Sequence, residues 1–119
     1  MILLAAVLLF GQTQMQMDQA ADAAFRRADA AMNAQYRATM AQMKRMDEDT
    51  PPHPPDPSFE AALLTSQRAW LKFRDAECLV EGYQYRGGSA EPMAAAQCLA
   101  TITEQRTKQL KTVANFWNH

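Results

Sequence analysis

Five prolines stand within seven residues, at positions 51 to 57, near the middle of a chain of 119 residues. Proline fixes φ and lacks an amide hydrogen, so this stretch cannot be helical and favours an extended conformation. Neither glycine nor proline occurs from about Met15 to about Met46, and residues with high helix propensity dominate the whole chain. We therefore predict an all-α fold, in which residues 50–57 form a proline-rich linker after a long first helix.

Apolar side chains recur every three or four residues along that first helix, which is the spacing of one face of an amphipathic helix. They are Ala21, Phe25, Ala28, Met32, Tyr36, Met40 and Met43.

Two more helices are predicted after the linker. Ser58 is suited to cap the first of them, which ends near residues 82–88, where three of the four glycines lie. Ser89 is predicted to cap the last helix, where Glu91 favours the N-terminal dipole and Pro92 is tolerated in the first turn. The apolar residues of the two helices are Phe59, Leu63, Trp70, Phe73, Leu79 and Val80, then Leu99, Ile102, Leu110, Val113 and Trp117.

The first ten residues carry no charge and include an unbroken apolar run from Ile2 to Phe10. This run is too short to cross a bilayer as a helix, but it suits the hydrophobic region of a secretory signal peptide. No lysine or arginine precedes it and no clear cleavage site follows, so a buried N-terminal segment is the alternative. We predict a signal peptide at residues 1–12, a helical domain at residues 13–117, and a periplasmic or secreted protein.

Cys78 and Cys98 are the only cysteines, with 19 residues between them. In an oxidising compartment such a pair suggests a disulfide, whereas two reduced, buried thiols are the alternative for a cytosolic protein. If the two are bonded, the last two helices form an antiparallel hairpin. Trp70 then lies level with Arg106, and Phe73 lies level with Thr103.

Several classes of function find no support in the sequence. The net charge of −1 gives no electrostatic case for nucleic acid or for an anionic membrane. The two histidines lack metal-ligand spacing, and no Ser-His-Asp or Cys-His set is present. Carboxylates could pair for glycoside chemistry, but nothing in the sequence indicates a cleft; they are Glu60, Glu77, Glu81 and Glu104. We expect no catalytic residue, no metal site and no cofactor.

The chain contains eight methionines. Thioethers select Cu(I), so an exported methionine-rich helix could sequester copper. Methionine also fills gaps in hydrophobic cores, which is the interpretation we favour. The residues concerned are Met15, Met17, Met40, Met43 and Met46.

The stretches QRAWLKFRDAEC, GGSAEPM and CLATITEQRTKQL resemble the LprI-like family, which is named for a lysozyme-inhibiting lipoprotein and was long catalogued as a domain of unknown function. TQMQMDQAADAAFRRADAAMN also resembles the opening of that family, so the likeness extends from Thr13 to Leu110. The family's first helix usually begins with a cysteine where this chain has Ala20, and the partner of that cysteine is missing as well. The resemblance implies a secreted or periplasmic helical domain, with lysozyme inhibition as its most concrete function.

We divide the noteworthy residues into two groups. The structural motif comprises Trp70, Arg74, Asp75, Thr103 and Arg106. The candidate partner-binding residues, for which a solvated loop is the alternative, are Tyr83, Tyr85, Arg86 and Ser89, because tyrosine and arginine are enriched at interface anchors. The hypothesis is an exported protein that binds a protein partner, with lysozyme as the concrete candidate. The alternative is a structural or stress-related periplasmic module without inhibitory activity. The sequence leaves the oligomeric state open.

Overall fold

The computed structural model consists of three α-helices and confirms the all-α prediction. It describes the backbone of residues 2–118 and the side chains of residues 13–118. Helix α1 spans Ile2–Asp49, α2 spans Phe59–Gly82 and α3 spans Glu91–Asn115, and a 3-10 helix, η1, spans Tyr83–Tyr85. Helix α1 is therefore longer at both ends than the sequence predicted. The predicted signal peptide at 1–12 lies outside the residues whose side chains are described.

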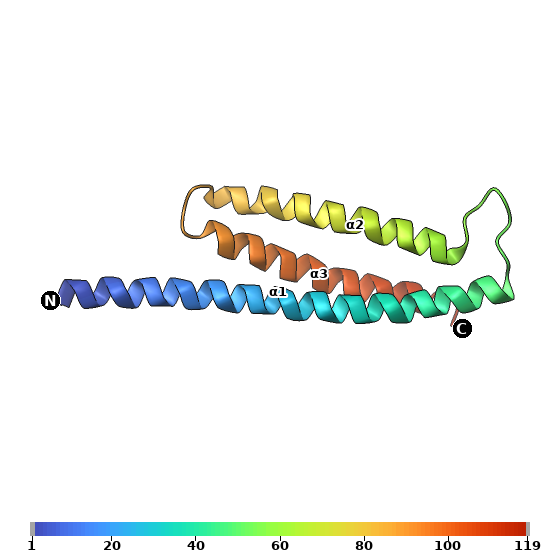
Figure 1. The fold of residues 1–119 in the computed structure, drawn as a ribbon, viewed down its shortest axis with the longest axis horizontal. Coiled ribbons are helices and arrows are strands. Elements are labelled where there is room, and N and C mark those ends of the chain that lie inside the picture. The colour runs from blue at the N-terminus through green and yellow to red at the C-terminus, as the bar shows by residue number, and fades with distance from the viewer. Residues whose placement is uncertain (1, 119) are drawn as a thin grey trace.

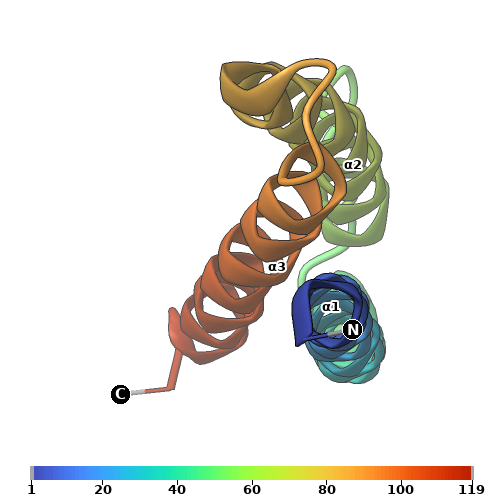
Figure 2. The ribbon, with the colours of Figure 1, turned by 90° about the vertical axis from the view of Figure 1, so that its left-hand side faces the viewer.

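The molecule is a rod with principal extents of 73, 23 and 18 Å. Helices α2 and α3 form the predicted antiparallel hairpin, and α1 runs along it and continues past the hairpin turn at its N-terminal end (Figure 1). Seen end-on, the helices do not lie in one layer: α1 lies below α2, and α3 lies beside them (Figure 2). Each helix can therefore bury one stripe of side chains against the other two.

The hydrophobic core lies in the half of the rod nearer the linker. Met32 and Leu110 are fully buried there, and Met43 and Leu63 complete the buried cluster. All three helices thus contribute to one core. The partly buried residues that pack around it are Tyr36, Met40, Met46, Phe59, Trp70, Leu71 and Val113.

The predicted apolar face of α1 is the face that packs inward. Ala21, Ala28, Met32 and Met43 are buried, and the other three residues of that face are half-buried. One polar residue, Thr39, interrupts the face and is fully buried. Its hydroxyl donates to the carbonyl oxygen of Leu110 on α3 at 2.9 Å and accepts from the Gln35 amide at 3.1 Å, which offsets the cost of burying it.

Helix α2 carries more apolar surface than the fold covers. Its buried stripe includes Leu63, Arg74 and Cys78, whereas Phe73 and Val80 are 57% and 63% exposed. Phe73 therefore points to solvent, although the register places it level with Thr103. The spacing of apolar residues could not reveal this, because α2 has a second apolar stripe beside the buried one.

Two side chains from different segments cap the N-terminus of α2. Ser58 accepts a hydrogen bond from the Ala61 amide at 3.1 Å, which confirms the predicted cap. Asp47, near the end of α1, reaches across the linker and accepts from the amides of Phe59 and Glu60 at 2.8 and 3.1 Å. These contacts satisfy amides that the helix itself leaves without partners. Asp47 thereby fixes where α2 begins relative to α1.

Replacing Asp47 with alanine is expected to lower the free energy of unfolding by about 0.5–2 kcal/mol, the range for losing an N-terminal cap. Urea denaturation followed by circular dichroism measures the change. Asp49→Ala is the matched control, because Asp49 is an acidic residue at the end of α1 that is exposed and accepts no hydrogen bond from the start of α2 among those described. Equal stability of the two variants would contradict the capping role of Asp47.

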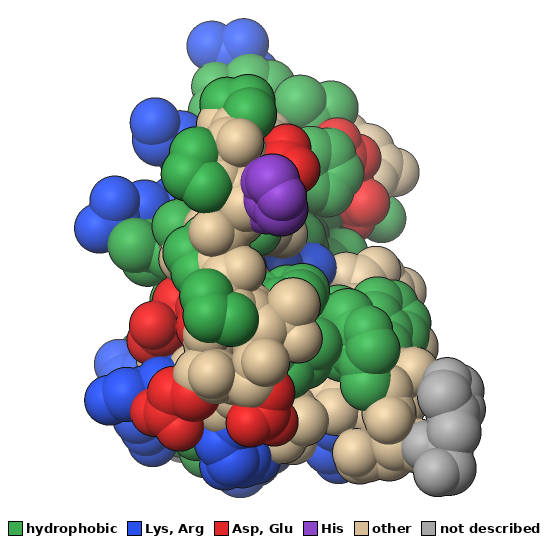
Figure 3. Space-filling model, turned by 90° about the vertical axis from the view of Figure 1, so that its right-hand side faces the viewer, with side chains coloured by type: hydrophobic (Ala, Val, Ile, Leu, Met, Phe, Trp, Pro, Cys, Tyr) green, Lys and Arg blue, Asp and Glu red, His purple; other side chains and the backbone are tan. Residues whose placement is uncertain are grey.

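The linker lies at a blunt end of the rod, where separate hydrophobic patches share the surface with acidic, basic and histidine side chains (Figure 3). A hydrogen bond of 2.9 Å from the Asp56 amide to the carbonyl of His53 closes a turn within it, so the linker is not extended throughout as predicted. Next to the linker, the Trp117 ring lies 5.6 Å from that of Phe59 and 5.5 Å from that of Phe116, both edge to face. Aromatic packing thus joins the end of α3 to the start of α2.

Candidate functional site: the tip of the hairpin

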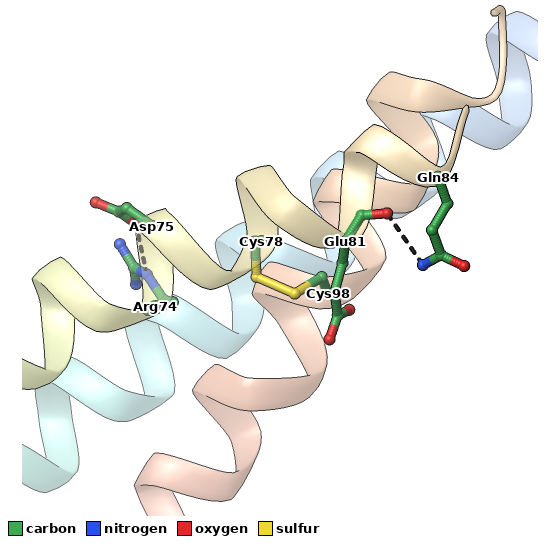
Figure 4. Close-up of a disulfide and its surroundings, with 6 residues drawn as sticks. All are labelled: Arg74, Asp75, Cys78, Glu81, Gln84 and Cys98. Atoms are coloured by element: carbon green, nitrogen blue, oxygen red, sulfur yellow. Dashed lines mark hydrogen bonds and ion pairs between the residues drawn. A yellow bond between two sulfur atoms is a disulfide. The ribbon is translucent and has the colours of Figure 1, made fainter. Parts of the chain in front are cut away.

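Cys78 and Cys98 form a disulfide, as predicted, with their Cα atoms 5.4 Å apart (Figure 4). Both cysteines are buried. The bond joins α2 to α3 a few residues below the turn that connects them. It therefore holds the two helices together next to the tip of the hairpin, which comprises residues 83–89.

Arg74 links α2 to α1. Its side chain forms ion pairs with Asp75 at 2.9 Å and with Asp29 of α1 at 3.1 Å. The guanidinium carbon also lies 5.2 Å from the ring centre of Phe25 and 5.5 Å from that of Trp70. Arg74 is buried, and a buried charge is tolerated when it is paired and hydrogen-bonded in this way. The Arg74–Asp29 pair thus joins α2 to α1, whereas the Arg74–Asp75 pair lies within α2.

Arg106 of α3 lies over Trp70, with its guanidinium carbon 5.7 Å from the ring centre, as the predicted register requires. Its three guanidinium nitrogens donate to neutral oxygens: Gln67 at 2.9 Å, Ser66 at 3.1 Å and Gln109 at 3.3 Å. No carboxylate among the described residues forms an ion pair with Arg106. Burial therefore lowers the pKa of Arg106, although arginine remains protonated in proteins. The contacts of this residue join α2 to α3.

Thr103 completes the predicted structural motif and is fully buried. Among the described residues, its hydroxyl is the one buried side-chain polar atom without a hydrogen-bond partner. Its backbone carbonyl accepts a hydrogen bond from the Thr107 hydroxyl at 3.2 Å. Four of the five motif residues, Trp70, Arg74, Thr103 and Arg106, therefore lie where helices pack together, whereas Asp75 is exposed and pairs with Arg74.

The turn at the tip is held by a series of short-range hydrogen bonds. The amides of Arg86 and Gly88 donate to the carbonyls of Tyr83 and Tyr85 at 3.1 and 2.8 Å. Gly87 has a φ of 80°, in the left-handed region that glycine adopts without steric cost. Just before the turn, the Gln84 amide group donates to the carbonyl of Glu81 at 3.1 Å (Figure 4). These contacts give the turn one defined backbone path.

The prediction that Ser89 caps α3 is wrong. The N-cap residue is Ala90, and no side chain makes the capping hydrogen bond. Glu91 instead reaches back to accept from the amide of Gly87 at 2.9 Å. The acidic residue of the first turn therefore stabilises the loop before the helix, and the Ser89 side chain remains exposed.

All four candidate partner-binding residues lie together at this tip and are exposed to solvent. Tyr83 is 42% exposed and Tyr85 is 49% exposed. The guanidinium carbon of Arg86 lies 4.6 Å from the centre of the Tyr83 ring. Within residues 13–118, no carboxylate is paired with Arg86. The tip thus presents aromatic surface and an unpaired positive charge on a turn closed by hydrogen bonds.

An open groove of about 670 Å³ runs from the tip along the hairpin, between α2 and α3. Two of the carboxylates considered for glycoside chemistry, Glu77 and Glu81, line it together with Trp70, Tyr85 and Ile102. They stand one turn apart on the same helix, and the opposite wall offers glutamine and threonine side chains. We assign no catalytic group to this groove.

The described residues offer no cluster of three or more His, Cys, Asp or Glu side chains able to hold a metal ion. Met32 and Met43 lie in the core, and Met40 and Met46 pack against it, so these thioethers fill space between the helices. None of the helices in the described part of the chain has a stretch both long and apolar enough to span a membrane.

The family model described as lysozyme inhibitor LprI matches residues 10–110, which is most of the chain and includes all of α2 and most of α3. The chain belongs to the LprI family. An uncharacterized protein of Rhizobium meliloti (strain 1021) is 39% identical over 102 residues, which cover 83% of this chain and 72% of that protein. No solved structure matches the chain. The LprI family is one of inhibitors, and a disulfide is consistent with export.

Sequence reasoning missed the partners of two motif arginines. Asp29 pairs with Arg74 across the helix interface, and Gln67 accepts from Arg106. Asp29 stands in the ADAAMN segment that resembles the opening of the LprI family. The resemblance therefore included Asp29, but nothing in the sequence predicted its ion pair with Arg74. Gln67 had no local signal, because a glutamine on a helix is ordinarily a solvated residue.

Proposed function

We propose that this chain is an exported binding protein whose mature part follows residue 12 and which inhibits lysozyme by protein–protein contact. The binding surface that we assign is the tip of the hairpin, residues 83–89. Membership of the LprI family supports the choice of partner, and the disulfide supports export. The proposal requires no catalysis by this chain.

The observation that carries the proposal is the exposure of Tyr85 and Arg86 on a turn backed by a disulfide. Lysozyme cleaves its substrate with two carboxyl groups in a cleft, so a protruding arginine without a carboxylate partner suits that cleft. Tyrosine and arginine are also the residue types enriched among interface anchors. The side chains fit the chemistry of such a partner.

Rigidity of the tip strengthens the case. Ordering a mobile loop on binding costs about 0.5–1.5 kcal/mol for each immobilised side chain. Here the turn is closed by its own hydrogen bonds and tied to α3 through Glu91. The Arg86 side chain lies against the Tyr83 ring before any partner arrives. Much of that ordering cost is therefore met when the protein folds.

The double variant Tyr85→Ala/Arg86→Ala is expected to weaken binding to lysozyme by more than about 1 kcal/mol, because it removes both anchors. Calorimetric titration measures the affinity, and the turbidity of a cell-wall suspension measures inhibition. Lys111→Ala/Phe116→Ala is the matched control, since it removes an exposed basic and an exposed aromatic residue at the other end of the rod.

Circular dichroism should show the same helix content for both double variants. Unchanged affinity of the tip variant would remove the tip as the binding site. Absence of any affinity of the parent protein for lysozyme would overturn the inhibitor assignment, leaving a structural or stress-related module of the envelope.

A further inference from the structure

The groove between α2 and α3 has an acidic wall on the α2 side. Four of the residues that line this wall follow one another at intervals of four: Phe73, Glu77 and Glu81 on α2, then Tyr85 in η1. Two carboxylates one helical turn apart thus stand between two aromatic residues. None of the described residues that line the groove is a lysine, an arginine or a histidine. The groove therefore carries negative charge without a positive group of its own.

The two carboxylates also lack a cationic partner elsewhere in the described part of the chain. Glu77 and Glu81 are each partly buried, yet neither forms an ion pair with a described residue. Like charges four residues apart on a helix repel each other. Partial burial removes some of the water that would otherwise solvate each charge. A positively charged ligand in the groove would relieve both effects.

The aromatic residues at the two ends of this wall favour the same kind of ligand. Phe73 and Tyr85 are exposed, and no described arginine or lysine lies over either ring. The Trp70 ring differs, because the guanidinium carbons of Arg74 and Arg106 already lie 5.5 and 5.7 Å from its centre. A cation is attracted to the face of an aromatic ring. Phe73 and Tyr85 are therefore the rings free to receive one.

We propose that this groove binds a basic peptide segment of a protein partner, with one lysine or arginine side chain on each of the two carboxylates. The proposal is independent of lysozyme inhibition. Residues four apart on a helix are separated by about 6 Å along its axis. Alternate residues of an extended peptide are about 7 Å apart and point to the same side. Two basic residues at alternate positions therefore match the spacing of Glu77 and Glu81.

The opposite wall suits a peptide better than a simple diamine. Gln97, Thr101 and Gln105 line it, and all three are exposed and neutral. Their side chains can both donate and accept hydrogen bonds. A peptide backbone offers N–H donors and C=O acceptors to such side chains, whereas a protonated diamine offers donors alone. The two walls together favour a peptide that carries positive charge.

An NMR titration of the isotope-labelled full chain with a blocked pentapeptide tests the proposal. The probe consists of alanine with arginine at its second and fourth positions, and it should cause saturable shifts of the amide signals along the groove. A second pentapeptide with arginine at its second and third positions has the same charge but directs these side chains to opposite sides. It should bind at least about threefold more weakly, the effect of losing one ion pair. Equal affinities of the two peptides would overturn the proposal.

Two double variants separate the groove from the general charge of the protein. Glu77→Gln/Glu81→Gln should weaken binding of the alternating peptide by more than about fivefold, because it removes both charges and keeps the side-chain shape. Glu48→Gln/Glu104→Gln is the matched control, since it changes the net charge equally at exposed glutamates outside the groove. Glutamine is a good helix former, so both variants should retain their helix content. Equal weakening in the two variants would refute the assignment to the groove.

Two other ligands test the choice of a peptide. Cadaverine carries two positive charges without peptide groups, and the trisaccharide chitotriose carries hydroxyl and amide groups without charge. Both should bind more weakly than the alternating peptide. Tighter binding of cadaverine would show that the groove selects charge alone, and tighter binding of chitotriose would show that it is a sugar site. Either result would overturn the proposal.

Discussion

Replacing Leu110 with alanine is expected to lower the free energy of unfolding by roughly 2–5 kcal/mol, the range for truncating a fully buried leucine. Leu110 has no exposed surface and lies in the cluster that all three helices build. Its carbonyl oxygen also accepts the hydrogen bond from Thr39, so α3 is held to α1 at this level by two kinds of contact. The cavity that alanine leaves could close only if the helices shifted.

Chemical denaturation followed by circular dichroism measures this change. Leu79→Ala provides the comparison, because Leu79 is 54% exposed and its truncation should alter stability by less than about 0.5 kcal/mol. Similar losses in the two variants would mean that the core does not lie where α1, α2 and α3 meet.

Removing the disulfide by the double change Cys78→Ala/Cys98→Ala is expected to lower the free energy of unfolding by roughly 2–4 kcal/mol. The bond joins residues 20 apart in sequence, so it restricts the unfolded chain chiefly within the hairpin. Changing both cysteines together avoids leaving one reactive thiol.

The denaturation midpoint of the parent should fall on treatment with a reductant, whereas the midpoint of the double variant should not move. A parent whose midpoint is unchanged by reduction, and equal to that of the variant, would show that the bond does not contribute to stability.

The arrangement of helices was predictable because the breaks in the chain are unambiguous. The prolines of residues 51–57 separate α1 from α2, and Gly82, Gly87 and Gly88 mark the tip. One covalent pair, Cys78 with Cys98, then fixed the level of every residue in the hairpin. That register placed Arg106 level with Trp70, and the two side chains are in contact in the structure.

The contacts that depend on three-dimensional proximity were not predictable. Asp47 caps a helix that begins twelve residues later, on the far side of the linker. Thr39 belongs to the buried face of α1 although it is polar, because a carbonyl of α3 happens to lie within reach. Ser89 had the residue type of a cap, but the longer Glu91 side chain reached the loop instead.

The candidate site was likewise predictable only in part. The four residues at the tip could be grouped from the sequence because they are neighbours along the chain. On α2, the exposed apolar residues Phe73 and Val80 could not be separated from the buried stripe, since apolar residues on either stripe recur at spacings of three and four residues. Which stripe faces inward is decided by α1, through partners such as Asp29.

The disulfide closes a loop that lies wholly inside the hairpin, and α1 is outside that loop. The disulfide holds α2 and α3 together at the tip. Helix α1 is held against this hairpin by side-chain packing and by the Arg74–Asp29 ion pair, and it is joined to α2 through the linker. If α1 unpacks from the hairpin while the linker still joins them, the disulfide is unaffected and the loop that presents Tyr85 and Arg86 stays closed.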